Sequence, residues 1–312
     1  MAFDAVIVTK DNEGYINKQL LEFLENSAKE AGAGSVTYAK AKPQRGSALI
    51  LRGDMPLLRP ETIKALAQGV PGEGSQDPEE FIEVDSAVKA AQALGLMRAR
   101  INAGHMENGV VIPDPSTVYI SHKARIETQS IIRPNTTIEG ESSVGKGCVI
   151  GPNTVITDST IMDGASVLMS VVTEATVGKD STVGPFAYLR PKAVLGEKVK
   201  VGDFVEIKNS NIGDGTKISH LTYVGDSDVG KNINFGCGTV TVNYDGKVKR
   251  RTVIKDGAFI GCNTNLIAPV TVGENAYTAA GSTITDEVPA GALAIARERQ
   301  KNIEGWVNKK KK

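Results

Sequence analysis

The chain has 312 residues, with 36 Lys and Arg against 36 Asp and Glu, so its formal net charge is zero. A balanced charge argues against a nucleic-acid-binding protein, which needs a basic face to displace the counterions of phosphates. The 40% apolar content excludes an acidic disordered chain, and 33 Gly beside 7 Tyr, 7 Phe and 1 Trp indicate many short strands joined by tight turns.

The first 82 residues predict a small α/β segment. Residues 5–8 and 48–51 are apolar enough for buried strands, and residues 19–30 suit a helix. The Pro- and Gly-rich stretch 71–78 predicts a loop or linker. The sequence does not open with a basic stretch and a long apolar run, and no apolar run approaches about 18 residues. We therefore expect neither a secretory signal nor a membrane span.

Residues 83–109 are expected to form a linker helix. Good helix formers (Ala, Leu, Met and Arg) dominate its central part, 87–105, and the Asn-Gly pair at 108–109 predicts its end. A spacing of three residues predicts one apolar stripe, made of Val88, Ala91, Leu94 and Met97.

From residue 120 an aliphatic residue recurs at every sixth position, with two slips of one residue and one longer break. These positions are Ile120, Ile126, Ile132, Ile138, Val144, Ile150, Ile156, Ile161, Val167, Val177, Val183, Leu189, Leu195, Val201, Ile207, Ile212, Ile218 and Val224. A period of six fits neither an α-helix nor a simple strand. It predicts stacked coils in which each aliphatic side chain points to the axis and rests on its equivalents.

Glycine often follows the aliphatic residue, where a repeated corner needs positive φ or the close approach of another backbone. We therefore expect a mainly β protein with a β-helix of hexapeptide repeats over residues 110–288. The periodic pattern stops after Val288, so residues 289–312 are expected to be a C-terminal tail, which ends in four lysines.

Three cysteines, Cys148, Cys237 and Cys262, are an odd number and lie far apart in the sequence. This spacing predicts neither a disulfide framework nor a metal site, and it favours a reduced, cytoplasmic protein. Cys148 is expected in the core.

Nine short blocks stand out within residues 100–312. They are residues 105–110, 184–191, 202–208, 219–226, 243–249, 268–273, 279–283, 294–297 and 304–306. In this order they resemble the C-terminal half of the bifunctional enzyme that makes UDP-N-acetylglucosamine (GlmU type). Hexapeptide repeats alone would indicate only a large acyltransferase superfamily. His-Leu-Thr-Tyr at 220–223 and Asn-Tyr-Asp-Gly at 243–246 are together more specific.

The resemblance implies a left-handed parallel β-helix, although generic rules for crossovers favour the right hand. It implies acetyl transfer from acetyl-CoA to the amine of glucosamine-1-phosphate. The product, N-acetylglucosamine-1-phosphate, would serve the synthesis of UDP-N-acetylglucosamine, peptidoglycan and lipopolysaccharide. The family resemblance also implies small-molecule substrates and a homotrimer with sites between its subunits.

The N-terminal part departs from the family. Residues 52–62 resemble the uridyltransferase segment with a magnesium-binding aspartate, here Asp54, and Asp85 falls near the place of a second metal ligand. The Gly-rich nucleotide loop is absent, and residues 1–82 are too few for a doubly wound nucleotide-binding sheet. We expect a shortened remnant of that domain, loss of uridylyl transfer, and a role for Mg²⁺ only if the activity survives.

Acetyl transfer to an amine needs a general base that keeps the amine neutral, and donors for the tetrahedral oxyanion. His220 is the predicted base, because histidine titrates near neutral pH and the other two histidines, His105 and His122, lie outside the most specific blocks. No cysteine nucleophile is needed, since a thioester is already activated.

The resemblance also implies the residues that hold the phosphorylated sugar. These are Arg190, Lys208, Tyr223, Asn234, Asn243, Tyr244 and Lys249. Arg binds phosphate through two donors and Lys as a point charge. Lys249 is expected to come from a neighbouring subunit, through a loop at 238–256 that interrupts the repeat. Backbone N–H groups near Tyr244 are the expected oxyanion donors.

For acetyl-CoA the resemblance points to Cys237, Cys262, Ala280 and Arg297. Family members carry small residues at the first three positions, so that pantetheine can lie against the coils, and Arg297 is expected to face a CoA phosphate. A nucleophilic Cys237 is an alternative, but a small packed residue explains this position.

Two other functions stay open. A bifunctional enzyme would also uridylylate the product with UTP, using Asp54 and Asp85. A non-catalytic β-helix would bind a partner or a metal, as carbonic-anhydrase-like relatives do, but those proteins need several His ligands on neighbouring coils.

Overall fold

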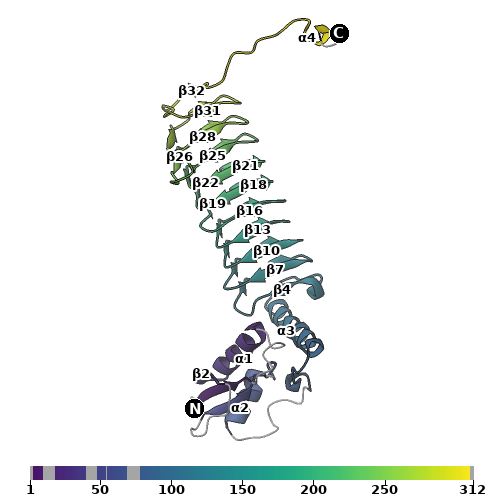
Figure 1. Cartoon of the computed structure of the whole chain (residues 1–312). Helices are drawn as coiled ribbons and strands as arrows, with labels where there is room; N and C mark the ends of the chain where they lie inside the picture. The colour runs from purple at the N-terminus through teal and green to yellow at the C-terminus, as the bar shows by residue number, and fades with distance from the viewer. Residues whose placement is uncertain (1–2, 10–17, 40–47, 54, 69–77, 310–312) are drawn as a thin grey trace. The chain divides into compact units, whose positions relative to one another are not determined.

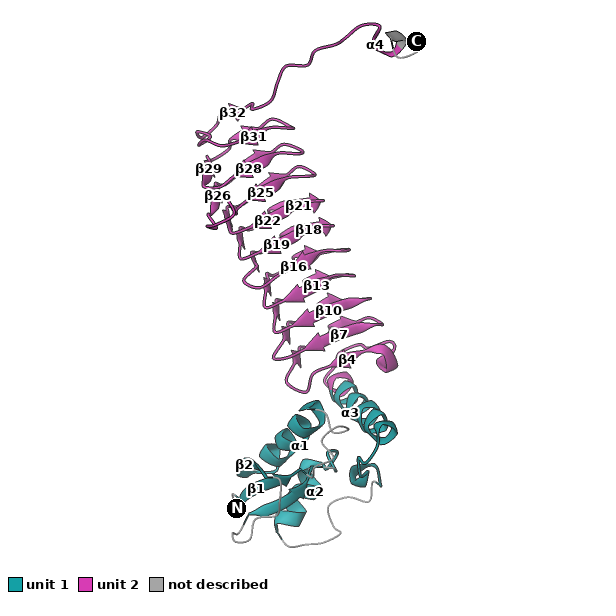
Figure 2. Cartoon of the chain, viewed as in Figure 1, with its two compact units in different colours: residues 1–104 teal, residues 105–312 magenta. Residues whose placement is uncertain are grey.

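The computed structural model describes residues 3–9, 18–39, 48–53, 55–68 and 78–309. The chain divides into two compact units, residues 1–104 and 105–312, which Figure 2 colours separately. None of the helices described in these ranges is long and apolar enough to cross a membrane. Asp54 and nearly all of the expected loop at 71–78 lie outside the described residues.

Unit 1 contains a three-stranded parallel sheet of order β2-β1-β3 (Figure 1). Its elements are β1 (Phe3–Val8), α1 (Lys18–Glu30), β2 (Ala33–Ala39), β3 (Leu49–Arg52), α2 (Pro60–Ala67) and the 3₁₀ turn η1 (Pro78–Phe81). The two expected strands and the helix at 19–30 are confirmed. No sequence pattern indicated α2, or β2, which has no buried residue. Ile7, Leu24, Leu51 and Ile63 are buried together, so the unit has a core of its own.

The expected linker helix is present as α3 (Ala87–Glu107), but its buried face matches the predicted stripe only at Met97 and, in part, at Leu94. Ala90, Ala93 and Met97 are buried, whereas Val88 is 78% exposed and Ala91 is exposed. A helix has 3.6 residues per turn, so a strict spacing of three drifts off one face, while alternating steps of three and four stay on it.

Unit 2 is a β-solenoid whose first parallel pairing, Val111↔Ile131, precedes the 3₁₀ turn η2 (Pro115–Thr117). Each coil contributes one short strand to each of three parallel sheets, and the chain visits the sheets in turn (Figure 1). We call the sheets face 1, face 2 and face 3, in the order in which the chain reaches them.

The strands of each face pair only with strands of the same face, one coil below and one coil above. Face 1 consists of β4 (Tyr119–Ile120), β7 (Thr136–Glu139), β10 (Thr154–Thr157), β13 (Val171–Thr173), β16 (Tyr188–Leu189), β19 (Glu206–Lys208), β22 (Tyr223–Gly225), β25 (Val240–Val242), β28 (Asn265–Ile267) and β31 (Thr283–Ile284). Face 2 consists of β5 (Arg125–Ile126), β8 (Ser143–Val144), β11 (Thr160–Ile161), β14 (Thr176–Val177), β17 (Val194–Leu195), β20 (Asn211–Ile212), β23 (Ser227–Val229), β26 (Thr252–Ile254) and β29 (Val270–Val272). Face 3 consists of β6 (Ile131–Ile132), β9 (Val149–Ile150), β12 (Ser166–Val167), β15 (Thr182–Val183), β18 (Lys200–Asp203), β21 (Lys217–His220), β24 (Asn234–Phe235), β27 (Phe259–Ile260), β30 (Tyr277–Thr278) and β32 (Leu293–Ala294).

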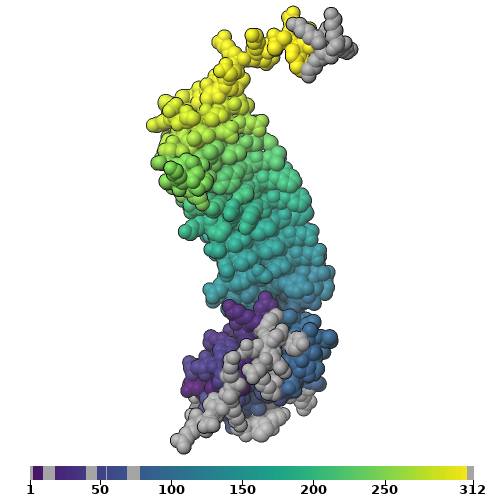
Figure 3. Space-filling model, in the orientation of Figure 1, coloured from purple at the N-terminus to yellow at the C-terminus, as the bar shows by residue number. Residues whose placement is uncertain are grey.

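The aliphatic residues of the predicted repeat are all buried along the axis of this solenoid. Val172, which the period of six skipped, fills the break before Val177 and is also buried. Burying one such side chain contributes roughly 1.5–3 kcal/mol. The colours of Figure 3 show that the coils stack in chain order. The expected parallel β-helix of hexapeptide repeats is confirmed. Cys148 is fully buried, as expected.

The glycines of the repeat serve two purposes. Gly151 and Gly184 turn corners with φ of 91° and 103°. Gly178 does not have a positive φ, but a Cβ added there would overlap the carbonyl oxygen of Gly196 in the next coil. Close stacking of coils therefore requires glycine at some positions, and left-handed backbone requires it at others.

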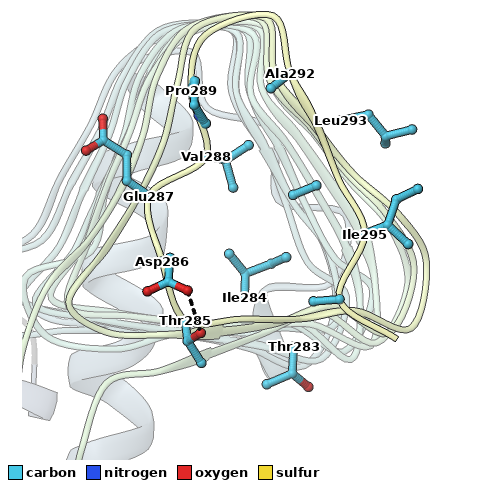
Figure 4. Close-up of a pocket in the computed structure, with 12 residues that line it drawn as sticks. Thr283, Ile284, Thr285, Asp286, Glu287, Val288, Pro289, Ala292, Leu293 and Ile295 are labelled. Atoms are coloured by element: carbon cyan, nitrogen blue, oxygen red, sulfur yellow. Dashed lines mark hydrogen bonds between the residues drawn. The ribbon is translucent and has the colours of Figure 1, made fainter. Parts of the chain in front are cut away.

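The solenoid continues beyond the expected end at Val288, because β32 pairs in parallel with β30. Its last coil closes only part of the end of the axial core. Figure 4 shows the resulting hollow, into which Ile284 and Val288 point. None of the predicted site residues that the structure describes lines this hollow. The chain then runs to a short helix, α4 (Trp306–Lys309).

Candidate active site

The corner where face 3 turns into face 1 carries four predicted site residues in a column, with Asp203 at its lower end. From one coil to the next the column contains Asp203, His220, Cys237, Cys262 and Ala280, and we call it the corner column. Asp203 pairs in register with His220. Higher up, the amide after Cys262 donates to the Cys237 carbonyl oxygen at 2.7 Å, and the amide after Ala280 donates to the Cys262 carbonyl oxygen at 2.8 Å.

His220 is held by Asp203, the residue directly below it. Its Nδ1 lies 2.6 Å from Asp203 Oδ1, and this hydrogen bond holds the pKa of the Asp203 carboxyl below its usual value. An ionised carboxylate can only accept, so Nδ1 carries the proton and donates it. In a neutral imidazole with this tautomer Nε2 has the lone pair, and the side chain of His220 is 59% exposed. The arrangement suits a general base.

Arg297 lies near the upper end of the corner column. Its Cδ is 3.8 Å from the place that a Cβ on Gly281 would take, beside Ala280. Cys262, Ala280 and Arg297 are exposed, and Cys237 is half-buried. The four residues expected to bind acetyl-CoA therefore follow one another along one edge of the solenoid, starting one coil above His220.

The opposite edge of face 1, where it turns into face 2, carries the cations. Arg190 follows β16, and Lys208 ends β19 on the next coil. Arg190 Nη1 donates to Glu206 Oε1 at 2.6 Å, which raises the pKa of the guanidinium, and its Cζ lies 5.8 Å from the centre of the Tyr188 ring. Arg190 is thus oriented before any ligand is bound.

Lys249 lies beside Lys208 of the same chain. The neighbouring Lys249 ammonium is the main cause of a lowered pKa at Lys208, and the charge of Arg190 adds to it. Lys249 is expected to serve the site of a neighbouring subunit, and within the single chain its charge and that of Arg190 both act on Lys208. Their mutual repulsion would be relieved by a bound anion.

The expected projecting loop is a hairpin at residues 243–251, between β25 and β26. Tyr244 and Lys249 form an antiparallel bridge, and Asp245 Oδ1 accepts from the Lys247 and Val248 amides at 2.8 and 2.7 Å. The Tyr244 side chain is 54% exposed. The hairpin therefore has a defined turn within one chain.

Arg251 fixes the base of this hairpin. Its Nε and Nη2 donate to the two carboxylate oxygens of Asp228 at 2.8 and 2.7 Å, and Nη2 also donates to the Ser227 carbonyl oxygen at 3.0 Å. The guanidinium holds the pKa of Asp228 below its usual value. A bidentate pair of this kind restrains both position and orientation.

Asp226 positions Asn243 at the other end of the hairpin. The carboxylate is 6% exposed and accepts hydrogen bonds from the side-chain amides of Asn243 and Asn209. Tyr223 lies on the same coil, and its ring covers Gly225, where any side chain would overlap it. Asn234 lies apart from this group on face 3, in register with Lys217.

The residues proposed for magnesium do not form a site in the described part of the chain. Asp85 is exposed, and its carboxylate lies 2.7 Å from Lys89 Nζ. Asp54 is outside the described residues. Within the ranges that the structure describes, no group of three or more His, Cys, Asp or Glu side chains comes together to hold a metal ion.

Sequence reasoning missed the side chains that position the predicted ones: Asp203, Glu206, Asp226, Asp228 and Arg251. The available signal was distance along the chain. Asp203 and His220, like Asp226 and Asn243, are 17 residues apart, which is one coil.

Comparisons with known proteins agree with this architecture. The family descriptions "GMPPB C-terminal domain" and "Bacterial transferase hexapeptide (six repeats)" match residues 115–203 and 251–286. A solved structure of UDP-N-acetylglucosamine acyltransferase from Francisella novicida aligns with 60% of this chain and 67% of its own, at 17% identity and a TM-score of 0.38. That score does not distinguish one β-solenoid from another, so the fold rests on the strand pairing above.

Two curated relatives carry the name bifunctional protein GlmU. The protein of Brevibacillus brevis is 51% identical over 247 residues, covering 79% of this chain and 54% of the relative. The protein of Clostridium beijerinckii is 54% identical over 232 residues, covering 74% and 51%. The chain thus spans about half the length of these relatives. Over about three quarters of its own length, the chain is therefore similar to proteins named GlmU, at 51–54% identity.

Proposed function

We propose that unit 2 transfers the acetyl group of acetyl-CoA to the amine of glucosamine-1-phosphate. The observation that carries this proposal is the His220–Asp203 pair at the foot of the corner column. Nε2 of His220 takes a proton from the amine as its nitrogen attacks the thioester carbonyl. The Asp203 carboxylate stabilises the resulting imidazolium, which gives its proton to the leaving sulfur as the C–S bond breaks, so that CoA leaves as its thiol and His220 is restored.

The other predicted residues bind and orient the reactants in this proposal. Arg190, Lys208 and Lys249 hold the phosphate, while Tyr223, Asn234 and Asn243 bind the sugar. Backbone N–H groups near Tyr244 donate to the tetrahedral oxyanion. Acetyl-CoA lies along Cys237, Cys262 and Ala280, with Arg297 at its phosphate end.

The proposed enzyme is a homotrimer whose sites lie between subunits. Its support, beyond the family resemblance, is an exposed apolar ridge at the corner beside His220. Phe186, Phe204 and Leu221 are 55%, 59% and 56% exposed, and the two Phe rings stack with centres 5.4 Å apart. Contiguous exposed apolar side chains mark interaction surfaces.

We propose further that this chain does not transfer uridylyl groups. The support is that Asp85 is exposed and paired with Lys89, and that the described sheet of unit 1 has three strands.

One preparation tests both activities. CoA release with acetyl-CoA and glucosamine-1-phosphate, and pyrophosphate release with UTP, Mg²⁺ and N-acetylglucosamine-1-phosphate, are measured side by side. We expect the first and not the second. No CoA release from folded protein would refute acetyl transfer, and pyrophosphate release would establish a bifunctional enzyme.

A further inference from the structure

Cys237 and Cys262 are 25 positions apart in the sequence, yet the coils place one above the other. β24 pairs with β27 in the register Asn234↔Phe259 and Phe235↔Ile260, and the same offset leads from Cys237 to Cys262. The hydrogen bond from the Asn263 amide to the Cys237 carbonyl oxygen continues this register through the corner. Neighbouring strands are about 4.8 Å apart, within the range of about 4.4–6.8 Å for the Cα atoms of a disulfide.

Cys237 and Cys262 differ in solvent exposure, and both are more exposed than Cys148. Cys262 is exposed, Cys237 is half-buried, and neither is in a disulfide. Cys148 is fully buried, its thiol lies 3.1 Å from the Met162 carbonyl oxygen, and burial raises its pKa. A reagent in solution can therefore reach Cys262 first, Cys237 stands next to it, and Cys148 is shielded.

We propose that Cys237 and Cys262 form a thiol-modification site that reacts with a low-molecular-mass disulfide. The Cys262 thiolate attacks one sulfur of the disulfide, the old S–S bond breaks, and one small thiol leaves with a proton. The Cys237 thiolate then attacks Cys262 Sγ, which forms the Cys237–Cys262 bond and releases the second small thiol. Two protein thiols are oxidised, and one disulfide is reduced to two thiols.

The oxidised pair would be strained and easily reduced. Side chains in parallel register point the same way, so their Cβ atoms are about as far apart as the strands, rather than the about 3.8 Å that a disulfide prefers. Strained, exposed disulfides have higher reduction potentials than structural ones. The modification is therefore reversible by ordinary thiols.

Oxidation at this place would stop acetyl transfer. This part of the inference rests on the proposed function, in which pantetheine lies over Cys237 and Cys262, one and two coils above His220. Drawing the two sulfurs together changes the surface under the thioester. A displacement of about 1 Å at a reacting group can reduce a rate about a hundredfold.

Intact-mass and peptide-mass measurements on the full chain test the inference. The protein is incubated with coenzyme A disulfide, remaining thiols are alkylated, and acetyl transfer is measured before and after dithiothreitol. We expect a loss of two hydrogen atoms, a peptide pair joined through Cys237 and Cys262, and a reversible loss of activity of about tenfold or more. The Cys237→Ser variant should instead retain the mixed disulfide on Cys262, and Cys148→Ser should react like the wild type.

The chemical and functional outcomes are separate. An unreacted protein, or mixed disulfides with no internal bond in the wild type, would overturn the modification site, and this result needs no activity. An internal disulfide with unchanged acetyl transfer would overturn the placement of the pair under the thioester. A protein that forms the disulfide but never transfers acetyl groups would refute the proposed function alone.

Discussion

His220 depends on a residue one coil away from it. The sequence identified the histidine through its block, but Asp203 lies in another block and had no assigned role. Seventeen residues separate them, and only the stacking of coils makes them neighbours at 2.6 Å. For the same reason, the sequence alone did not show that Asp226 lies next to Asn243, or Cys237 next to Cys262, on neighbouring coils. Residue types and blocks predicted candidate side chains, whereas the coil offset decides which residues hold them in place.

The substitution Asp203→Asn tests the base. The new side-chain amide would be neutral, so it could neither select the Nδ1–H tautomer of His220 nor stabilise the imidazolium. We expect kcat to fall about 10- to 100-fold with little change in KM, as steady-state acetyl transfer measures. Asp214→Asn is the matched control, because Asp214 pairs with Lys231 at 2.8 Å and belongs to no predicted site. Equal effects of the two substitutions would contradict a specific role for Asp203.

Replacing Lys208 by Ala tests the cation group. We expect KM for glucosamine-1-phosphate to rise about tenfold, because one charge on the phosphate is lost, and the salt dependence of KM to weaken. Glucosamine without phosphate should show no such difference between variant and wild type. Lys146→Ala, at an exposed lysine outside the site, is the control. A similar rise in KM for both sugars would show that Lys208 does not bind the phosphate.

Among the elements, the hairpin at 243–251 was easiest to locate and hardest to describe. Its break in the six-residue rhythm predicted a loop, but the sequence did not reveal that Arg251 ties it to Asp228.

The linker helix shows the opposite case. Its composition predicted its place well, but a spacing of three predicted only part of the buried face, because packing follows the 3.6-residue turn, which buries Met97 and leaves Val88 exposed.

The Asp228–Arg251 pair makes hairpin order depend on pH. The pKa of Asp228 is lowered in the folded protein from its ordinary value of 3.8, so the stabilisation is present above that value. It is lost as the pH falls through the lower, folded pKa. Protection factors for the amides across 244–250, which compare each exchange rate with its intrinsic rate at the same pH, should therefore be high at neutral pH and fall only in strong acid. In Arg251→Ala they should already be low at neutral pH, whereas Arg299→Ala should match the wild type.

Across the whole molecule, the fold of unit 2 was predictable and that of unit 1 only partly so. A repeat of six restates the same physical requirement in every coil, so errors at one position, such as the omission of Val172, do not matter. Unit 1 has no such redundancy. Its exposed strand β2 follows no apolar pattern and exists because it pairs with β1.

The proposed trimer can be tested by a substitution in the exposed apolar ridge. Phe204→Glu places a charge in the exposed ridge without removing a buried side chain, so we expect folded monomers and a loss of acetyl transfer of tenfold or more. Light scattering and circular dichroism measure mass and folding. Tyr119→Glu, at a side chain 53% exposed on the first coil, should stay trimeric. A wild-type monomer with full activity would contradict sites between subunits.

The corner column also sets the distance between the predicted base, His220, and the predicted CoA-phosphate ligand, Arg297. Every coil adds the same increment of about 4.8 Å, so the span from His220 to Arg297, four coils on, is roughly 19 Å. The length of ligand that fits between the base and the last cation is therefore fixed by counting coils. One coil inserted between Cys262 and Ala280 would leave the cross-section intact and lengthen that span by a single step. A solenoid can thus change the reach of its site by duplication, without redesigning any residue in it.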